Sequence, residues 1–156
     1  MPNLEETVAA LTRRVEQLED ERAIQKVLNT YGLSVDADNP EAMGQLYAED
    51  CVIDIDGMFF NGREDAKRIV TGEGHQAILP NCAHVMGPFA ITLDGTNAVA
   101  TGYATIFVRE NGTVGIWRQA YIRWELVKRD GRWQVLKRYS RTTGKVESQA
   151  LLNAAL

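Results

Sequence analysis

Residues 29–36 read Asn29-Thr30-Tyr31-Gly32-Leu33-Ser34-Val35-Asp36, and they end a stretch with helical periodicity. Apolar residues recur in this stretch at steps of three and four, namely Ile24, Val27, Leu28, Tyr31 and Val35. This spacing predicts an amphipathic helix that packs one face against the core. We therefore expect Asp36 at or just past the end of this helix, with its carboxylate on the core-facing side.

His84 opens an apolar run further along the chain, and the only other histidine, His75, lies in a Gly-flanked segment that is typical of a loop. A neutral imidazole accepts a proton near neutral pH, and a carboxylate on its other nitrogen fixes the tautomer. Asp36 and His84 are therefore a candidate base with its orienting partner. Ordinary structural roles, as a turn residue and a core histidine, remain the alternative.

Composition excludes several classes of protein. A length of 156 residues predicts one domain, and 45% hydrophobic with 24% charged residues is usual for a globular chain. No apolar run approaches the ~18 residues of a membrane span, and the polar N-terminus lacks a signal-peptide core. We therefore expect a cytoplasmic protein that does not associate with membranes.

Net charge and cysteine spacing narrow the kinds of partner and bound group that we expect. A net charge of −4 argues against a nucleic-acid partner, which usually requires a basic patch. Cys51 and Cys82 lack CxxC spacing, so we expect both to be reduced. The chain has two histidines and no recognised metal motif, so neither a metal site nor a cofactor is predicted.

The N-terminal residues show a second periodicity. Apolar residues alternate steps of four and three, as in a coiled-coil seam: Leu4, Val8, Leu11, Val15 and Leu18. The seam breaks at Arg22, so residues 1–21 are predicted to form a separate heptad-like helix that packs on its own domain or on another subunit. The main domain is expected to span residues 22–144, followed by a weakly helical tail at 145–156.

The second half of the chain alternates apolar and polar residues as strands do. Three turn dipeptides, Asp94-Gly95, Asn111-Gly112 and Asp130-Gly131, separate four long runs and predict an antiparallel meander. Strands this long must twist and curl, with a bulge expected near Gly102 or Gly115. Helices precede these strands, so we predict an α+β fold in which three N-terminal helices and a cone-shaped, curled antiparallel sheet enclose an apolar pocket.

Three segments resemble the SnoaL-like group of the nuclear transport factor 2-like superfamily, over roughly residues 22–141. They are Ala23-Ile24-Gln25-Lys26-Val27-Leu28-Asn29-Thr30-Tyr31 with Val35-Asp36, Leu46-Tyr47-Ala48-Glu49-Asp50-Cys51-Val52, and Asn61-Gly62-Arg63-Glu64. The members most similar in site layout are hexachlorocyclohexane dehydrochlorinase, scytalone dehydratase and bile-acid 7α-dehydratase, which are cofactor-free eliminating enzymes. The resemblance implies that Asp36 and His84 form the catalytic dyad and that Tyr31 faces the pocket. The second strand histidine of scytalone dehydratase has no counterpart here.

Several functions use such a dyad. The first hypothesis is a lyase acting on a small, apolar, ring-containing molecule, and an isomerase or cyclase needs the same parts. A non-catalytic binding or assembly module is the next alternative. An epoxide hydrolase would place Arg118 or Arg141 between two carboxylates, but no partner aspartate on the strands is identified. The predicted substrate-binding residues are Tyr31, Met86, Tyr103, Phe107, Trp117 and Arg118. The resemblance also implies a homo-oligomer, a trimer first and a dimer next.

Overall fold

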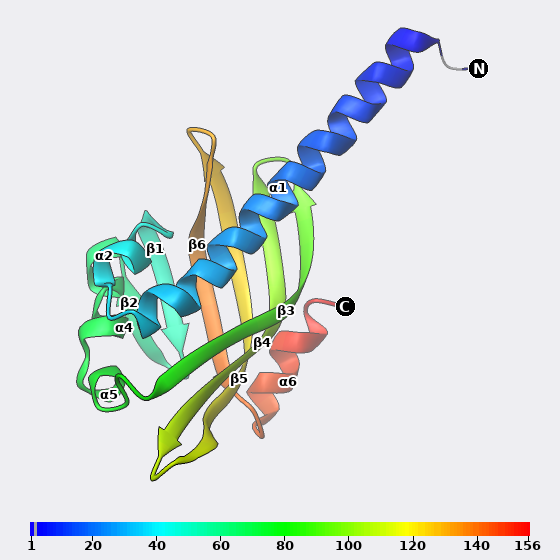
Figure 1. The fold of residues 1–156 in the computed structure, drawn as a ribbon. Coiled ribbons are helices and arrows are strands. Elements are labelled where there is room, and N and C mark those ends of the chain that lie inside the picture. Colours follow the sequence, from blue (N-terminus) through cyan, green and yellow to red (C-terminus); the bar gives the residue numbers. More distant parts are fainter. Residues whose placement is uncertain (2) are drawn as a thin grey trace.

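The computed structural model describes Met1 and residues 3–156 of the chain. Figure 1 shows helices and strands in the following order. They are α1 (Leu4–Asp36), α2 (Pro40–Gly44), β1 (Tyr47–Ile55), β2 (Met58–Asn61), α3 (Arg63–Ala66), α4 (Arg68–Thr71), α5 (Glu73–Gln76), β3 (Cys82–Asp94), β4 (Asn97–Glu110), β5 (Thr113–Arg129), β6 (Arg132–Thr142) and α6 (Val146–Asn153). The α+β class is confirmed. No described helix is both long and apolar enough to cross a bilayer.

Helix α1 is continuous, so the predicted break at Arg22 is wrong. A capping box starts the helix, with the Asn3 side chain accepting from the Glu6 N–H and the Glu6 carboxylate accepting from the Asn3 N–H. Glycine and proline are absent between this cap and Tyr31, and nothing else in the stretch stops a helix. What changes near Arg22 is the packing, because the N-terminal half of α1 extends beyond the sheet (Figure 1).

The sheet has the strand order β2-β1-β6-β5-β4-β3, and β3 to β6 form the predicted antiparallel meander. Asn111 and Gly112 have φ values of 49° and 79°, and Asp130 and Gly131 have φ values of 50° and 73°, as type I′ hairpin turns require. Strand β1 differs from the antiparallel expectation, because it pairs parallel with β6. These two strands are far apart in sequence, so no hairpin dictates their relative direction.

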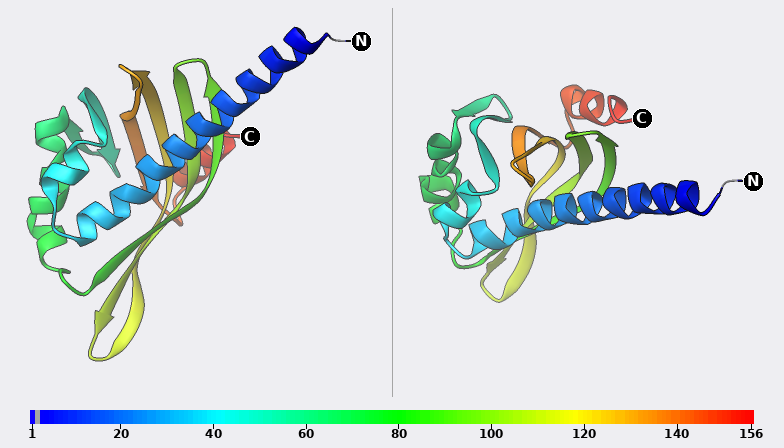
Figure 2. Two further views of the ribbon diagram at one scale, coloured as in Figure 1. Left: turned by 45° about the horizontal axis from the view of Figure 1, so that its top comes forward. Right: turned by 90° about the horizontal axis from the view of Figure 1, so that it is seen from above.

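The expected bulges are present. The pairing of β3 with β4 shifts register between Met86 and Phe89, opposite Gly102. A Cβ atom at Gly102 would clash with the Pro88 carbonyl oxygen, so only glycine allows this approach. A second shift, between β4 and β5, lies close to Gly115. Bulges bend and twist long strands, and the sheet curls accordingly (Figure 2).

The core lies between the C-terminal half of α1 and the sheet. Ile24, Leu28 and Val35 of α1 are fully buried, together with Ile122 and Trp124 of β5. The C-terminal tail forms α6, which packs on β5 and β6 on the side of the sheet opposite to α1 (Figure 2). This arrangement brings the end of α1 against β3, where the two predicted catalytic residues lie.

Candidate active site

Asp36 and His84 are in direct contact. Asp36 is the last residue of α1, and its Oδ1 lies 2.6 Å from His84 Nδ1 on β3. Its Oδ2 accepts the backbone N–H of His84 at 2.7 Å. Because a carboxylate accepts hydrogen bonds, His84 carries its proton on Nδ1 and its lone pair on Nε2.

Gly32 allows this contact. A Cβ atom at residue 32 would lie 2.6 Å from the His84 carbonyl oxygen, a distance that real Cβ atoms do not show. The glycine therefore lets α1 approach β3 closely enough for a short aspartate side chain to reach the imidazole. A glycine one turn before Asp36 thus permits the dyad geometry.

A cavity of about 520 Å³ opens in front of His84. Its walls are mainly apolar, and four predicted binding residues line it: Tyr31, Met86, Trp117 and Arg118. A volume of this size, with a few polar groups among apolar side chains, is typical of a site for a small molecule. His84 faces the cavity, whereas Asp36 lies behind His84 and does not line the cavity.

Tyr103 and Phe107 do not line this cavity, in contrast to the prediction. Side chains alternate along a strand, and the β4 residues that face the cavity are Ala104 and Ile106. Tyr103 points away, is 46% exposed, and packs edge-on against Tyr121. Phe107 lines a separate surface depression near Cys82. The sequence could not show which strand face encloses the cavity.

His75 is a site residue that the sequence analysis assigned to a loop. It lies on the four-residue helix α5, and its ring centroid is 5.6 Å from that of His84. Its Nδ1 is 3.0 Å from the Val70 carbonyl oxygen, which can only accept, so this nitrogen carries the proton. Nε2 is buried and has no hydrogen-bond partner among the described residues. The only sequence feature that pointed to a role for His75 in the site is that the chain has just two histidines.

Arg138 on β6 is a second residue that the sequence analysis missed. It lines the cavity but is only 4% exposed. Its guanidinium carbon lies 4.4 Å from the centroid of the Tyr31 ring and 4.7 Å from that of Trp124, both cation–π distances. No carboxylate of the described residues forms an ion pair with it. The cavity thus contains a permanent positive charge that a substrate anion could balance.

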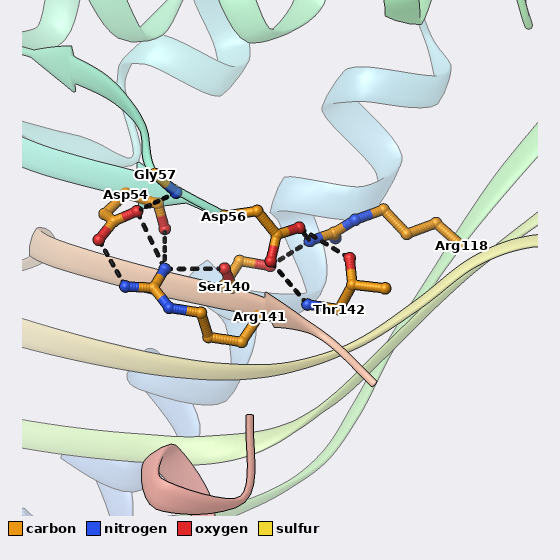
Figure 3. Close-up of polar contacts among 7 residues, drawn as sticks. All are labelled: Asp54, Asp56, Gly57, Arg118, Ser140, Arg141 and Thr142. Atoms are coloured by element: carbon orange, nitrogen blue, oxygen red, sulfur yellow. Dashed lines mark hydrogen bonds and ion pairs between the residues drawn. The ribbon is translucent and has the colours of Figure 1, made fainter. Parts of the chain in front are cut away.

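Arg118 and Arg141 both have aspartate partners at the end of β1, which the sequence alone did not identify (Figure 3). Arg141 forms hydrogen bonds of 2.9 and 2.6 Å to the two carboxylate oxygens of Asp54. Arg118 donates to Asp56, directly after β1, at 2.8 Å. Burial would raise the pKa of Asp56, but hydrogen bonds from Arg118 and Thr142 outweigh this effect and lower the pKa to about 2. Asp56 therefore stays ionised at the cavity wall.

The pKa of His84 is below its usual value. Burial lowers it, the hydrogen bond and charge of Asp36 oppose this effect, and the nearby charges of His75 and Arg138 lower it further. If His84 is a base, protonation inactivates it, so kcat/KM should fall only as the pH drops below about 6.5. A pH profile of kcat/KM tests this expectation. A midpoint well above the usual histidine pKa would contradict it.

Comparisons with known proteins cover most of the chain. The family described as "SnoaL-like domain" matches residues 16–139. A solved NTF2-like protein with a cystatin-like fold from Novosphingobium aromaticivorans is 28% identical, with a TM-score of 0.89, covering 97% of this chain and 98% of that one. These matches extend over nearly all elements described above, including the segments that carry Asp36 and His84.

More distant structures share the fold. A scytalone dehydratase-like protein from Novosphingobium aromaticivorans is 25% identical, with a TM-score of 0.70, covering 81% of this chain and 86% of that one. LinA is 19% identical, with a TM-score of 0.74, covering 83% of this chain and 90% of that one. No curated protein matches this chain significantly in sequence.

Proposed function

The chain belongs to the SnoaL-like domain family, and we propose that it is a cofactor-independent lyase that eliminates water or a halide from a small, ring-containing molecule. One observation carries the proposal. The Nδ1 of His84 is held by Asp36, so that its Nε2 lone pair is free in an apolar cavity. This arrangement is that of a general base oriented by a carboxylate. Structural neighbours that include dehydratase and dehydrochlorinase enzymes agree with it.

The proposed reaction uses four residues. His84 Nε2 removes a proton from the carbon next to an activating group, and the C–H electron pair becomes a C=C bond as the leaving group departs from the adjacent carbon. Negative charge then develops on the leaving group or on the activating oxygen. Arg138 stabilises this charge electrostatically, and the neighbouring Tyr31 donates a hydrogen bond from its phenol. Asp36 stabilises the His84 imidazolium that forms.

The cavity walls indicate the class of substrate. Flat aromatic and aliphatic side chains form much of the wall, which suits a ring: Phe60, Met86, Ile106 and Trp117. The unpaired charge of Arg138 at the same cavity favours a substrate with an electronegative group, such as a carbonyl, hydroxyl or halide. We therefore propose a cyclic compound with a leaving group next to an acidic C–H bond.

Two alternatives fit the site less well. An epoxide hydrolase needs a carboxylic acid that gives a proton, but Asp56 is held ionised by Arg118 and Thr142. A pure binding module does not require contact between Asp36 and His84, yet the two are 2.6 Å apart. An isomerase that returns the proton elsewhere on the substrate uses the same dyad and is the second candidate function.

The reaction class can be tested without knowing the natural substrate. Cyclic β-hydroxy and β-halo ketones are incubated with the protein in D2O and followed by NMR. Loss of water or halide with a new alkene signal is the expected result. Deuterium exchange without loss of the leaving group would indicate an isomerase. Saturable binding without exchange or elimination would favour the binding module.

Two tyrosines offer a matched test of the proposed oxyanion donor. Tyr31→Phe removes a phenol at the cavity and should lower kcat by up to about 10²-fold, as the loss of one such donor does. Tyr103→Phe removes the same group outside the cavity and should leave kcat unchanged. Equal effects of the two substitutions on steady-state kinetics would remove Tyr31 from the mechanism.

We also propose that the protein is a homo-oligomer. The seam residues Leu4, Val8, Leu11, Val15 and Leu18 are between 53% and 80% exposed in the isolated chain, which is unfavourable for such a stripe in water. Light scattering should give a mass two or three times the 17.4 kDa of the monomer. Deletion of residues 1–20 should reduce the number of subunits. An unchanged number of subunits after deletion would assign the contact to another surface, and a monomeric full chain would contradict the proposal.

A further inference from the structure

Four potential metal ligands meet beside the cavity wall that His75 and His84 line. They are Asp36, His75, Cys82 and His84, and one ligand atom from each lies within 4.8 Å of all the others. Two imidazoles, a thiol and a carboxylate are the donor types that zinc-like transition metals use in proteins. Only the tertiary structure brings them together, because they come from α1, α5 and β3.

Part of the cluster already has the spacing of a coordination shell. Ligands at the usual bond lengths in a tetrahedral zinc site lie roughly 3.3–3.8 Å apart. Cys82 Sγ is 3.5 Å from Asp36 Oδ1 and has this spacing. His84 Nδ1 is 2.6 Å from the same oxygen, a hydrogen-bond distance that must lengthen when an ion binds between them. His75 must approach by a small distance, and it lies on the short helix α5 between β2 and β3 rather than on the sheet.

Outer hydrogen bonds orient two of the donors. The Nδ1–H of His75 donates to the Val70 carbonyl oxygen, which directs the unprotonated Nε2 away from that carbonyl. Asp36 Oδ2 accepts the His84 backbone N–H, which leaves Oδ1 for the cluster. Ligands in metal sites are oriented by such partners. The buried Nε2 of His75 has no hydrogen-bond partner among the described residues, so coordination would satisfy it.

We propose that Asp36, His75, Cys82 and His84 bind a divalent ion of the zinc type. On binding, the Cys82 thiol releases its proton to solvent, and the ion takes the place of the His84 Nδ1 proton, which moves to Nε2. With Nε2 protonated, His84 cannot act as a base. The ion and the proposed dyad chemistry therefore exclude each other, and the site makes elimination sensitive to transition metals.

Cobalt titration of the tag-free, chelator-treated protein tests the site without any substrate. We expect one Co²⁺ per chain and a near-ultraviolet thiolate-to-cobalt absorption band. Cys82→Ser should remove the band, whereas Cys51→Ser, which changes the other free cysteine, should keep it. His75→Ala should weaken binding by at least about 10-fold, the smallest loss seen even for outer-shell changes.

Two results would overturn the proposal. One is wild-type protein that binds no stoichiometric Co²⁺, and the other is equal binding by the wild type, Cys82→Ser and His75→Ala. Near-ultraviolet circular dichroism establishes that each variant is folded, and His75→Gln replaces His75→Ala if that variant is not. Because these measurements use no substrate, they succeed or fail independently of the proposed lyase activity.

Discussion

His84→Ala should abolish elimination while leaving the fold intact. The substitution removes the only lone pair that Asp36 orients toward the cavity, and a positioned base contributes on the order of 10²–10⁴-fold in rate. The fold should persist because Asp36 also accepts the backbone N–H of residue 84, which alanine keeps. Steady-state kinetics with a substrate from the NMR panel measure the loss of kcat.

Chemical rescue provides the control for this variant. His84→Ala leaves space at the cavity wall, so added imidazole should restore part of the lost rate if the missing group is a base. The Tyr103→Phe variant, altered outside the cavity, should react at the wild-type rate in the same assay. Full activity of His84→Ala would exclude His84 as the base of the elimination.

Asp36→Asn should lower the rate by a comparable factor without a change of shape. The backbone N–H of His84 must still find an acceptor, so we expect the oxygen of the new amide to face it. The amide NH2 group then faces Nδ1 and donates a hydrogen bond to it. The proton of the imidazole then moves to Nε2, which no longer has a lone pair to accept a proton from the substrate. We expect kcat to fall on the order of 10²–10⁴-fold.

The double variant distinguishes a dyad from two independent residues. Groups that act as a unit are not additive, so Asp36→Asn combined with His84→Ala should lose little more than either single variant. Losses that multiply would contradict the tautomer argument. Thermal unfolding of all three proteins controls for stability, because Asp36 also links the end of α1 to β3.

Much of the fold could be predicted from the sequence because the relevant signals are local. Asn111-Gly112 and Asp130-Gly131 favour positive φ values through the preferences of their own residues, so these two hairpin turns could be predicted locally. The periodicity that ends at Asp36 likewise predicted a helix and its buried face. The break at Arg22 was wrong because a change of the apolar stripe marks a change of packing partner, which need not end a helix.

The site could be predicted only in part. Asp36 and His84 were identifiable because one ends a helix and the other opens a strand, and the resemblance paired them. Arg138 was not identifiable, since a basic residue in an alternating strand usually faces solvent, and only the curl of the sheet buries it between Tyr31 and Trp124. Tyr103 was misplaced for the same reason, because alternation does not say which face is concave.

The sequence by itself determined the element types, the hairpin turns, the bulges and the two residues of the proposed dyad, because conformational preferences act over a few neighbouring residues. Tertiary structure alone decided the parallel pairing of β1 with β6, the ion pairs of Asp54 and Asp56, and the meeting of His75 and Cys82 with the dyad. These contacts join residues far apart in the chain. Their geometry depends on how the long strands curl and how closely Gly32 lets α1 approach β3, and no short stretch of sequence encodes either.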